Sequence, residues 1–255
     1  MQQNTSAGTN LGFLFKKYYI ENSGRLWLGL GSIVGAMAVM GFLSGAFSVT
    51  DGSGLFVIFG IILSVVGLAA ASQMFSDMRT KEGRISLLMT PASAFSEFFV
   101  RWTVWVPGCL AALVMAFYIG DWSRMLGAFL FDHYVDRVHL SDFFTARPFY
   151  VSSICFMMYL ALQSFFVLGA VLWPKLSFLK TVIALWLLQT VLGTVASLSV
   201  MSVRNKLAFI IFSDDINFED RFGDGMYALV IGFYALVCLV NWSIAWLRLK
   251  ESDAI

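Results

Sequence analysis

The residue types best suited to metal or acid–base chemistry gather between positions 121 and 148, where both histidines of the chain lie. Within this segment, five side chains of metal-ligating type lie close together in sequence: Asp132, His133, Asp136, His139 and Asp142. If this segment were a helix, the side chains of His133, Asp136 and His139 would be offset from one another by about 60° around its axis, so they would share one face only loosely. Zinc sites need three or four convergent ligands. We therefore interpret the segment as a solvated outer segment, with an enzyme built on this cluster as an alternative.

Two further patterns fall short of a chemical site. Asp215 begins a stretch like a calcium-binding loop, but the sixth position is Asp220 instead of glycine and the twelfth is Met226 instead of glutamate. The three cysteines form no CxxC pair and lie in different apolar runs: Cys109, Cys155 and Cys238. An odd, dispersed set argues against a disulfide framework, so we interpret them as small core hydrophobic residues.

The composition points to a membrane protein. The chain has 255 residues, of which 59% are hydrophobic and 13% are charged. A soluble monomer of this size could not bury so much apolar surface. The net charge of +1 and the lack of a basic block argue against nucleic-acid binding. We therefore expect a single transmembrane domain over residues 1–255, with the lipid bilayer as its surroundings.

Six apolar runs without a charged residue are long enough to cross a bilayer as helices, which takes about 20 residues each. They are long and continuous, whereas barrel strands alternate with a period of two. The sequence therefore predicts an all-α, polytopic fold. The predicted spans cover residues 27–47, 55–75, 102–120, 149–173, 181–203 and 226–247.

The distribution of Lys and Arg predicts the orientation of the spans. The side that holds both termini and the loops after spans two and four carries 11 Lys and Arg residues, and the other side carries 6. Acidic residues divide as 6 and 10, so the two sides have net charges of +5 and −4. By the positive-inside rule, both termini are expected in the cytoplasm.

None of the six runs contains Asp, Glu, Lys, Arg or His. Proton- and ion-coupled carriers usually place such groups at membrane depth, so a self-powered pump is disfavoured. The chain also lacks HExxH, GxSxG and GxxxxGK[ST], which argues against intramembrane hydrolysis and against ATP binding by this chain. We expect no catalytic residues, no cofactor and no metal, and energy for any uphill transport must come from another subunit.

Residues 11–22 before the first span are expected to form an interfacial helix on the cytoplasmic leaflet. Four apolar residues follow helical spacing, with two lysines on the other side: Leu11, Leu14, Phe15 and Tyr18, with Lys16 and Lys17. Gly24 is expected to end this helix before the span begins. A plain membrane anchor is the alternative function for this segment.

The loop between spans two and three, residues 76–91, combines charged and apolar residues. Its charged members are Asp77, Arg79, Lys81, Glu82 and Arg84, and Ile85, Leu88 and Met89 add apolar surface. Gly83 can close the extension of span two, and Thr90 is expected to cap a new helix with Pro91 in its first turn. The result would be a short cytoplasmic helix that serves as a docking surface. A solvated loop on lipid headgroups is the alternative.

This loop resembles the corresponding loop in membrane subunits of bacterial type-2 ABC exporters. The residues that carry the resemblance are Leu87, Leu88, Met89, Thr90, Pro91, Ala92 and Ser93, followed by Phe98 or Phe99 and by Arg101. Thr90 departs from the leucine that usually precedes the proline. The layout of an amphipathic N-terminal helix, six spans and cytoplasmic termini is also similar.

The resemblance implies a permease subunit in the bacterial inner membrane. In that family the loop forms a coupling helix that binds a separate ATP-binding subunit, and two permease copies, as a homo- or heterodimer, assemble with two ATPases. The residues that would contact the ATPase are Met78, Arg79, Lys81, Glu82, Arg84 and Leu88. The alternative function is a non-transporting membrane scaffold or assembly factor that uses the same docking surface.

Small residues and one proline mark sites of helix packing within the spans. The small pairs are Gly31 with Gly35, Gly41 with Gly45, and Gly193 with Ser197. They allow helix backbones to approach closely, either within the chain or at a dimer seam. Pro107, followed by Gly108, is expected to kink the third span. The kink is either static or a hinge.

Overall fold

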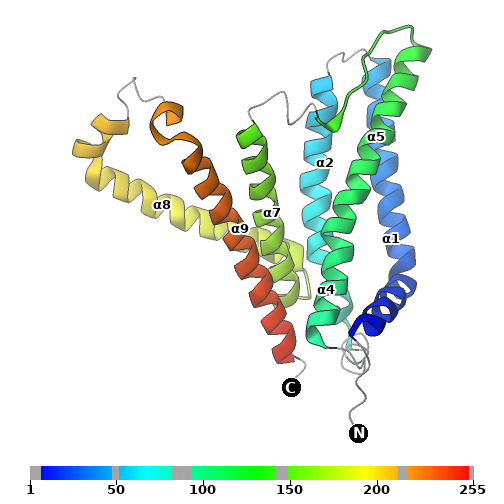
Figure 1. Cartoon of the computed structure of the whole chain (residues 1–255), viewed down its shortest axis with the longest axis horizontal. Helices are drawn as coiled ribbons and strands as arrows, with labels where there is room; N and C mark the ends of the chain where they lie inside the picture. Colours follow the sequence, from blue (N-terminus) through cyan, green and yellow to red (C-terminus); the bar gives the residue numbers. More distant parts are fainter. Residues whose placement is uncertain are drawn as a thin grey trace.

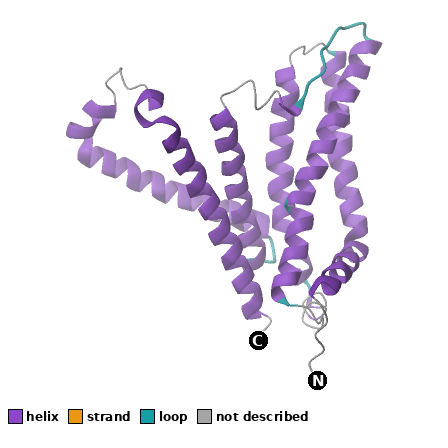
Figure 2. Ribbon diagram, viewed as in Figure 1, coloured by secondary structure: helices purple, strands orange, loops and turns teal. Residues whose placement is uncertain are grey.

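The structure of the chain is a computed structural model that describes residues 7–47, 52–81, 85, 93–141, 149–211 and 218–252. Within these ranges the elements are helices and no strand occurs. The elements are α1 (Ala7–Ala46), α2 (Gly52–Gln73), the 3₁₀ helix η1 (Ser76–Arg79), α4 (Ala94–Trp105), α5 (Pro107–Leu130), α7 (Phe149–Leu172), α8 (Ser177–Ile211) and α9 (Phe218–Ser252) (Figures 1 and 2).

Among the described residues, six helical stretches are long and apolar enough to cross a membrane, which confirms the prediction of an all-α fold with six helices of this kind. They are Leu11–Ala46, Gly54–Gln73, Ala94–Leu130, Ser152–Leu172, Ser177–Val195 and Tyr227–Glu251. The third stretch contains both α4 and α5. This arrangement fits a multi-pass membrane protein.

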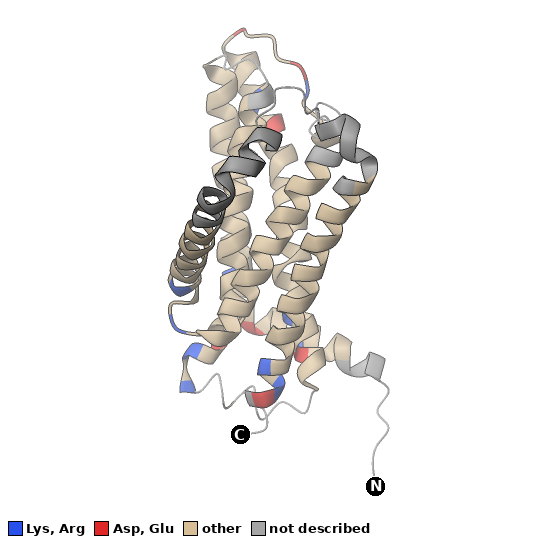
Figure 3. Cartoon of the chain, turned by 90° about the vertical axis from the view of Figure 1, so that its left-hand side faces the viewer, with Lys and Arg blue, Asp and Glu red and all other residues tan. Residues whose placement is uncertain are grey.

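The predicted helix end at Gly24 is wrong, because α1 runs as one helix of 40 residues through this position. A glycine inside a helix costs only about 1 kcal/mol, and Arg25 and Leu26 directly after it are good helix formers. A separate interfacial helix is therefore not shown. The N-terminal end of α1 nevertheless turns away from the long axis of the bundle (Figure 3).

The third span is longer than the predicted 102–120, since helix extends from Ala94 to Leu130 with a single break at Val106. Residues 121–130, which were predicted to open an outer loop, are therefore helical in the structure. Asp121 and Arg124 form an ion pair across one turn of the helix. Because the two charges neutralise each other, the helix can continue past them. Helices α8 and α9 likewise extend beyond the predicted 181–203 and 226–247.

The helices form two groups that meet along α2 and α7 and, at one end, along α4 and α9 (Figure 1). Helices α1, α2, α4 and α5 form one group, and α7, α8 and α9 form the other. The start of α1 and the end of α9 lie at the same end of the molecule, where charged residues gather (Figure 3). We call this end the charged end, and the other the far end.

Two buried clusters hold the bundle together. The larger joins α2, η1, α4, α7 and α9 and contains Phe75, Met78, Phe98, Phe166 and Leu249. The smaller joins α1, α2 and α5 around Met37, Leu55 and Phe117. Helix α8 contributes little to either cluster, and it diverges from α7 toward the far end (Figure 1).

Candidate functional site

The candidate site is the short segment after α2 at the charged end. Helix α2 ends at Gln73, and the backbone then tightens into η1, with the Met78 N–H donating to the Phe75 carbonyl at 3.1 Å. Thr80 has extended backbone geometry and ends this turn. Residues 74–80 of the segment therefore stay close to the helix ends around them.

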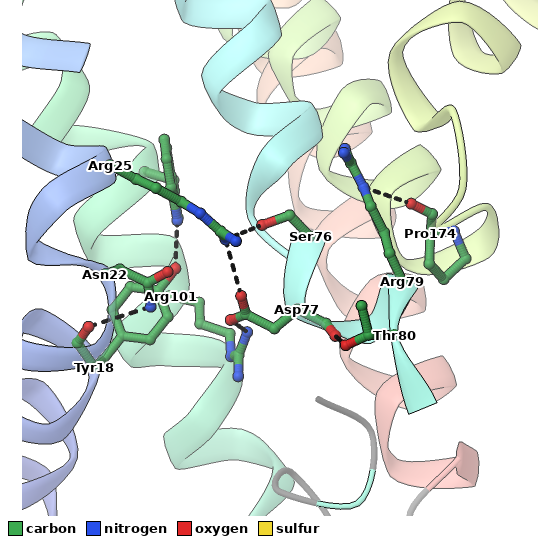
Figure 4. A network of polar contacts seen from close by, with 10 residues as sticks. Tyr18, Asn22, Arg25, Ser76, Asp77, Arg79, Thr80, Arg101 and Pro174 are labelled. Carbon is green, nitrogen blue, oxygen red and sulfur yellow. Dashed lines mark hydrogen bonds and ion pairs between the residues drawn. The ribbon is translucent and has the colours of Figure 1, made fainter. Parts of the chain in front are cut away.

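Asp77 in η1 binds one arginine from each of two helices (Figure 4). Arg25 of α1 lies 3.2 Å from Asp77 Oδ1 and also donates to the Ser76 hydroxyl at 3.3 Å. Arg101 of α4 lies 3.1 Å from Asp77 Oδ2. One carboxylate thus connects α1 and α4 through η1, and we call this trio the Asp77 junction.

The two arginines of the junction differ in their surroundings. The Arg25 side chain is 62% exposed, whereas that of Arg101 is 11% exposed. The Arg101 guanidinium lies over the rings of Tyr18, at 5.2 Å, and Phe75, at 5.5 Å. Trp105 Nε1 donates to the Tyr18 hydroxyl at 2.5 Å. Arg101 is therefore held by an aromatic cage, whereas Arg25 is held mainly by its ion pair.

A third connection runs from η1 to the second group of helices. Arg79 Nε donates to the Pro174 carbonyl in the turn between α7 and α8, at 2.9 Å (Figure 4). The Met78 side chain is buried in the larger cluster, between α2, α4, α7 and α9. The segment after α2 is thus fixed to helices of both groups.

The predicted ATPase-contact residues divide into three sets. Met78 is buried within the chain, and Arg79 donates to a backbone carbonyl of the chain. Lys81 is exposed. Glu82, Arg84 and Leu88 lie outside the described residues, as do Thr90 and Pro91. Contact with a partner stays a prediction for all six residues. Of the three that the structure describes, Lys81 is the one whose side chain is exposed and makes no hydrogen bond to the backbone of the chain.

The cap of the next helix differs from the prediction. Helix α4 begins at Ala94, and Ser93 is its N-cap, with the Ser93 hydroxyl accepting from the Ser96 N–H at 3.2 Å. Thr90, the predicted cap, lies outside the described residues, and Ser93 is the cap that the structure shows for α4. Serine caps helices somewhat better than threonine. Position also matters, because a capping side chain must stand directly before the first turn to reach the N–H groups of that turn.

The predicted kink in the third span is confirmed at Pro107. The helix breaks at Val106, between α4 and α5, and Val106 still donates to the Trp102 carbonyl at 2.8 Å. Proline lacks an N–H, so the Thr103 carbonyl loses its helical partner at this point. Gly108 follows at the start of α5. Motion about this kink stays a prediction.

At the far end, a buried ion pair lies inside α5. Arg124 Nη2 donates to Asp121 Oδ1 at 2.8 Å, and the two side chains are only 1% and 2% exposed. The same nitrogen also donates to the Asp136 carbonyl in the segment that follows α5. We call residues 131–139 the strap, because Arg124 fastens this segment back onto the bundle.

The metal hypothesis was evaluated for a helix over His133, Asp136 and His139. The strap is not helical there, because residues 133–139 have no regular structure. Among the described residues, no group of three His, Cys, Asp or Glu side chains could hold a metal ion, and Asp142 lies outside them. Arg137 lies over the Trp122 ring at 5.6 Å. The Tyr134 hydroxyl donates to the Asp136 carboxylate, and this acceptor and its charge raise the pKa of Tyr134.

Next to the ion pair, α1 and α5 pack backbone to backbone. A β-carbon at Gly41 would overlap the Gly120 carbonyl, one at Gly45 would overlap the Arg124 carbonyl, and one at Gly127 would lie 2.5 Å from the Phe42 carbonyl. We call this contact the glycine seam. It confirms packing within the chain for the Gly41 and Gly45 pair.

The other small pairs do not make such contacts. A β-carbon at any of Gly31, Gly35 and Gly193 would meet no atom within 4 Å. The interpretation that these three glycines pack within the chain is therefore wrong. A role in contact with a second copy stays a prediction for them.

Sequence reasoning missed both ion-pair sites. Neither Arg25 nor Arg101 was predicted to form an ion pair, since their partner Asp77 lies 52 and 24 positions away in the chain. Asp121 and Arg124 carried a local signal, because opposite charges at i and i+3 face one another on a helix.

Comparison of the chain with family models, with curated proteins and with solved structures finds no match. Functional conclusions about this chain therefore rest on the geometry of the described residues.

Proposed function

We propose that this chain is the permease subunit of an ATP-driven exporter of the type-2 ABC class in the bacterial inner membrane. It would work with a second permease copy and with separate ATP-binding subunits. The observation that carries the proposal is the segment after α2, which contacts helices of both groups at once. A protein bound there could move several spans together.

The contacts of η1 supply a mechanical route from this segment into the bundle. Asp77 joins η1 to α1 through Arg25 and to α4 through Arg101. Arg79 joins η1 to the turn between α7 and α8. A displacement of η1 would therefore be passed to the charged ends of α1, α4 and α8. The break at Pro107 is the natural bending point for the motion of α4 relative to α5.

The burial of Met78 refines the roles within the proposed contact set. In the proposal, Met78 and Arg79 hold the segment to the bundle, because both engage other parts of the chain. Lys81, Glu82, Arg84 and Leu88 form the surface offered to the ATPase. The charged end, with both termini, faces the cytoplasm, and the N-terminal turns of α1 lie along the inner leaflet.

Purification from membranes of the native host tests the proposal. The complex is solubilised in mild detergent, and co-purifying chains are identified by mass spectrometry. We expect a chain with a phosphate-binding loop and measurable ATP hydrolysis. The variant Lys81→Glu should reduce its recovery several-fold. Lys250→Glu, a matched charge reversal at the exposed end of α9, should leave recovery unchanged.

Three outcomes would contradict the proposal. One is a purified protein with no ATP-hydrolysing partner. Another is a cysteine at position 81 that reacts with an impermeant reagent only from the periplasmic side. A third is a partner that binds without hydrolysing nucleotide, which would favour the scaffold.

A further inference from the structure

A cleft of about 540 Å³ lies between α1, α2 and the kinked α4 and α5. Pockets that bind small ligands usually measure about 300–1,000 Å³. The cleft follows α1 from Arg25 to Ile33, which at the helical rise is roughly 12 Å. This length is close to the depth of one leaflet, since the hydrocarbon core is about 30 Å thick in total.

The sequence explains why the helices leave this space open. Pro107 breaks the third span beside the cleft, at the junction of α4 and α5. Small residues are among those that line the space, and they include Gly29, Ser32, Ala69, Gly108 and Ala112. A β-carbon at Gly29 would meet no atom within 4 Å, so the position is open and not packed. The cleft therefore lies beside the break in the third span, and short side chains leave part of it unfilled.

The wall is mainly apolar, and its charged group lies at one end. Arg25 and Gln73 line the cleft at the charged end. Most of the other lining residues are apolar, with Trp105 on the α4 side. Val65, which also lines the cleft, is 59% exposed on the outer surface of α2, so the cleft opens toward the surroundings of the helices.

The Asp77 junction, at the charged end of the cleft, carries a net positive charge. Arg25 and Arg101 share the single carboxylate of Asp77, which leaves one positive charge in excess within the Asp77 junction (Figure 4). Arg25 is the more exposed of the two, at 62%, so it can bind an additional anion while it keeps its contact with Asp77. Basic pockets between transmembrane helices are places where anionic lipid headgroups bind.

We infer that this cleft binds an anionic amphiphile, a lipid whose acyl chain lies between α1 and α2 and whose negative headgroup pairs with Arg25. The apolar wall excludes a purely polar ligand, and the excess positive charge selects an acidic headgroup over a zwitterionic one. The site does not depend on the proposed permease function, since it needs only the helices and the bilayer.

The test measures lipid binding to the delipidated full chain in detergent by native mass spectrometry. Phosphatidylglycerol, phosphatidylcholine with the same acyl chains and inorganic phosphate are titrated separately. We expect phosphatidylglycerol to bind about tenfold more tightly than phosphatidylcholine, which corresponds to about 1.4 kcal/mol. Inorganic phosphate should not displace it.

Two pairs of variants separate the cleft from the rest of the surface. Gly29→Leu fills the cleft and should abolish binding, whereas Gly35→Leu adds the same side chain at an open position of α1 outside the cleft and should bind like the parent. Arg25→Gln should remove the preference for phosphatidylglycerol, and Arg25→Lys should restore part of it. Arg248→Gln removes an exposed charge near the end of α9 and should change nothing.

The inference is overturned if Gly29→Leu and Gly35→Leu bind phosphatidylglycerol equally well, because the lipid would then lie elsewhere. It is also overturned if the parent protein does not distinguish the two lipids, or if inorganic phosphate competes with phosphatidylglycerol. Circular dichroism and size-exclusion profiles that match the parent's confirm that each variant is folded.

Discussion

Arginine and aspartate meet at both ends of the molecule, in opposite surroundings. At the far end, Asp121 and Arg124 lie within one helix and are 1–2% exposed. At the charged end, Asp77 joins arginines of two other helices, and it is 26% exposed. Charges attract far more strongly in a buried site than near water, but burial also removes their hydration. The far pair is therefore costly to disturb, and the Asp77 junction can rearrange at small cost.

This difference in burial suggests that the far end is the rigid part of the molecule and that the charged end is the part that can change conformation. The far pair adjoins the glycine seam and holds the strap, so several contacts depend on one geometry. The Asp77 junction links separate elements through side chains that can exchange partners. Conformational change is therefore expected at the charged end, with the far end of α1 and α5 moving as a unit.

The largest expected effect is that of Arg124→Met, which leaves Asp121 buried without its partner. Loss of one member of a buried pair typically costs about 3–5 kcal/mol of unfolding free energy. The double variant Asp121→Leu with Arg124→Met should recover much of this loss, since no unpaired charge remains. Unfolding in detergent, followed by tryptophan fluorescence, measures both. A double variant as unstable as the single one would show that the pair is needed for more than charge balance.

The next effect is that of Gly45→Leu in the glycine seam. The new side chain would meet the backbone of α5 at Arg124, and overpacking of this kind costs about 1–3 kcal/mol. Gly31→Leu is the matched control on the same helix, because its β-carbon meets nothing. Equal thermal midpoints for the two variants would mean that α1 and α5 are not in backbone contact.

The two arginines of the Asp77 junction are expected to differ in how much their loss lowers the free energy of unfolding. Arg101→Gln is expected to cost about 1.5–3 kcal/mol, because a buried charged hydrogen bond and the aromatic cage are lost. Arg25→Gln should cost about 0.2–1 kcal/mol, as exposed ion pairs do. The same unfolding assay ranks the two. A reversed order would contradict the assignment of Arg101 as the buried anchor.

The smallest effect concerns Tyr134 in the strap, which is 88% exposed. Its pKa is raised by the Asp136 carboxylate, so its contribution to stability is complete below the unfolded pKa of about 10 and is lost as pH rises further. The unfolding midpoint of the parent should therefore fall slightly more between pH 8 and pH 11 than that of Tyr134→Phe. Parallel pH profiles would show that the hydroxyl makes no such bond.

The number of spans could be predicted from the sequence, because length and hydrophobicity of a run are local properties. The kink at Pro107 was also predictable, since a missing N–H acts wherever proline stands within a helix. The Asp77 junction was not, because nothing local to Arg25 shows that a carboxylate 52 positions later will meet it. The end of α5 was misplaced because a charged residue was taken to end the span, although Asp121 and Arg124 neutralise each other.

The glycine seam also determines where a solute cannot travel. Two backbones in direct contact leave no file of water and no gap for a permeating molecule, so the crossing of α1 and α5 is sealed. Any route across the membrane must pass along other faces, and α8 exposes apolar side chains on several of its sides, such as Trp186, Leu187 and Val191. A conduit through the chain would therefore be bounded by other helices and not by the crossing of α1 and α5.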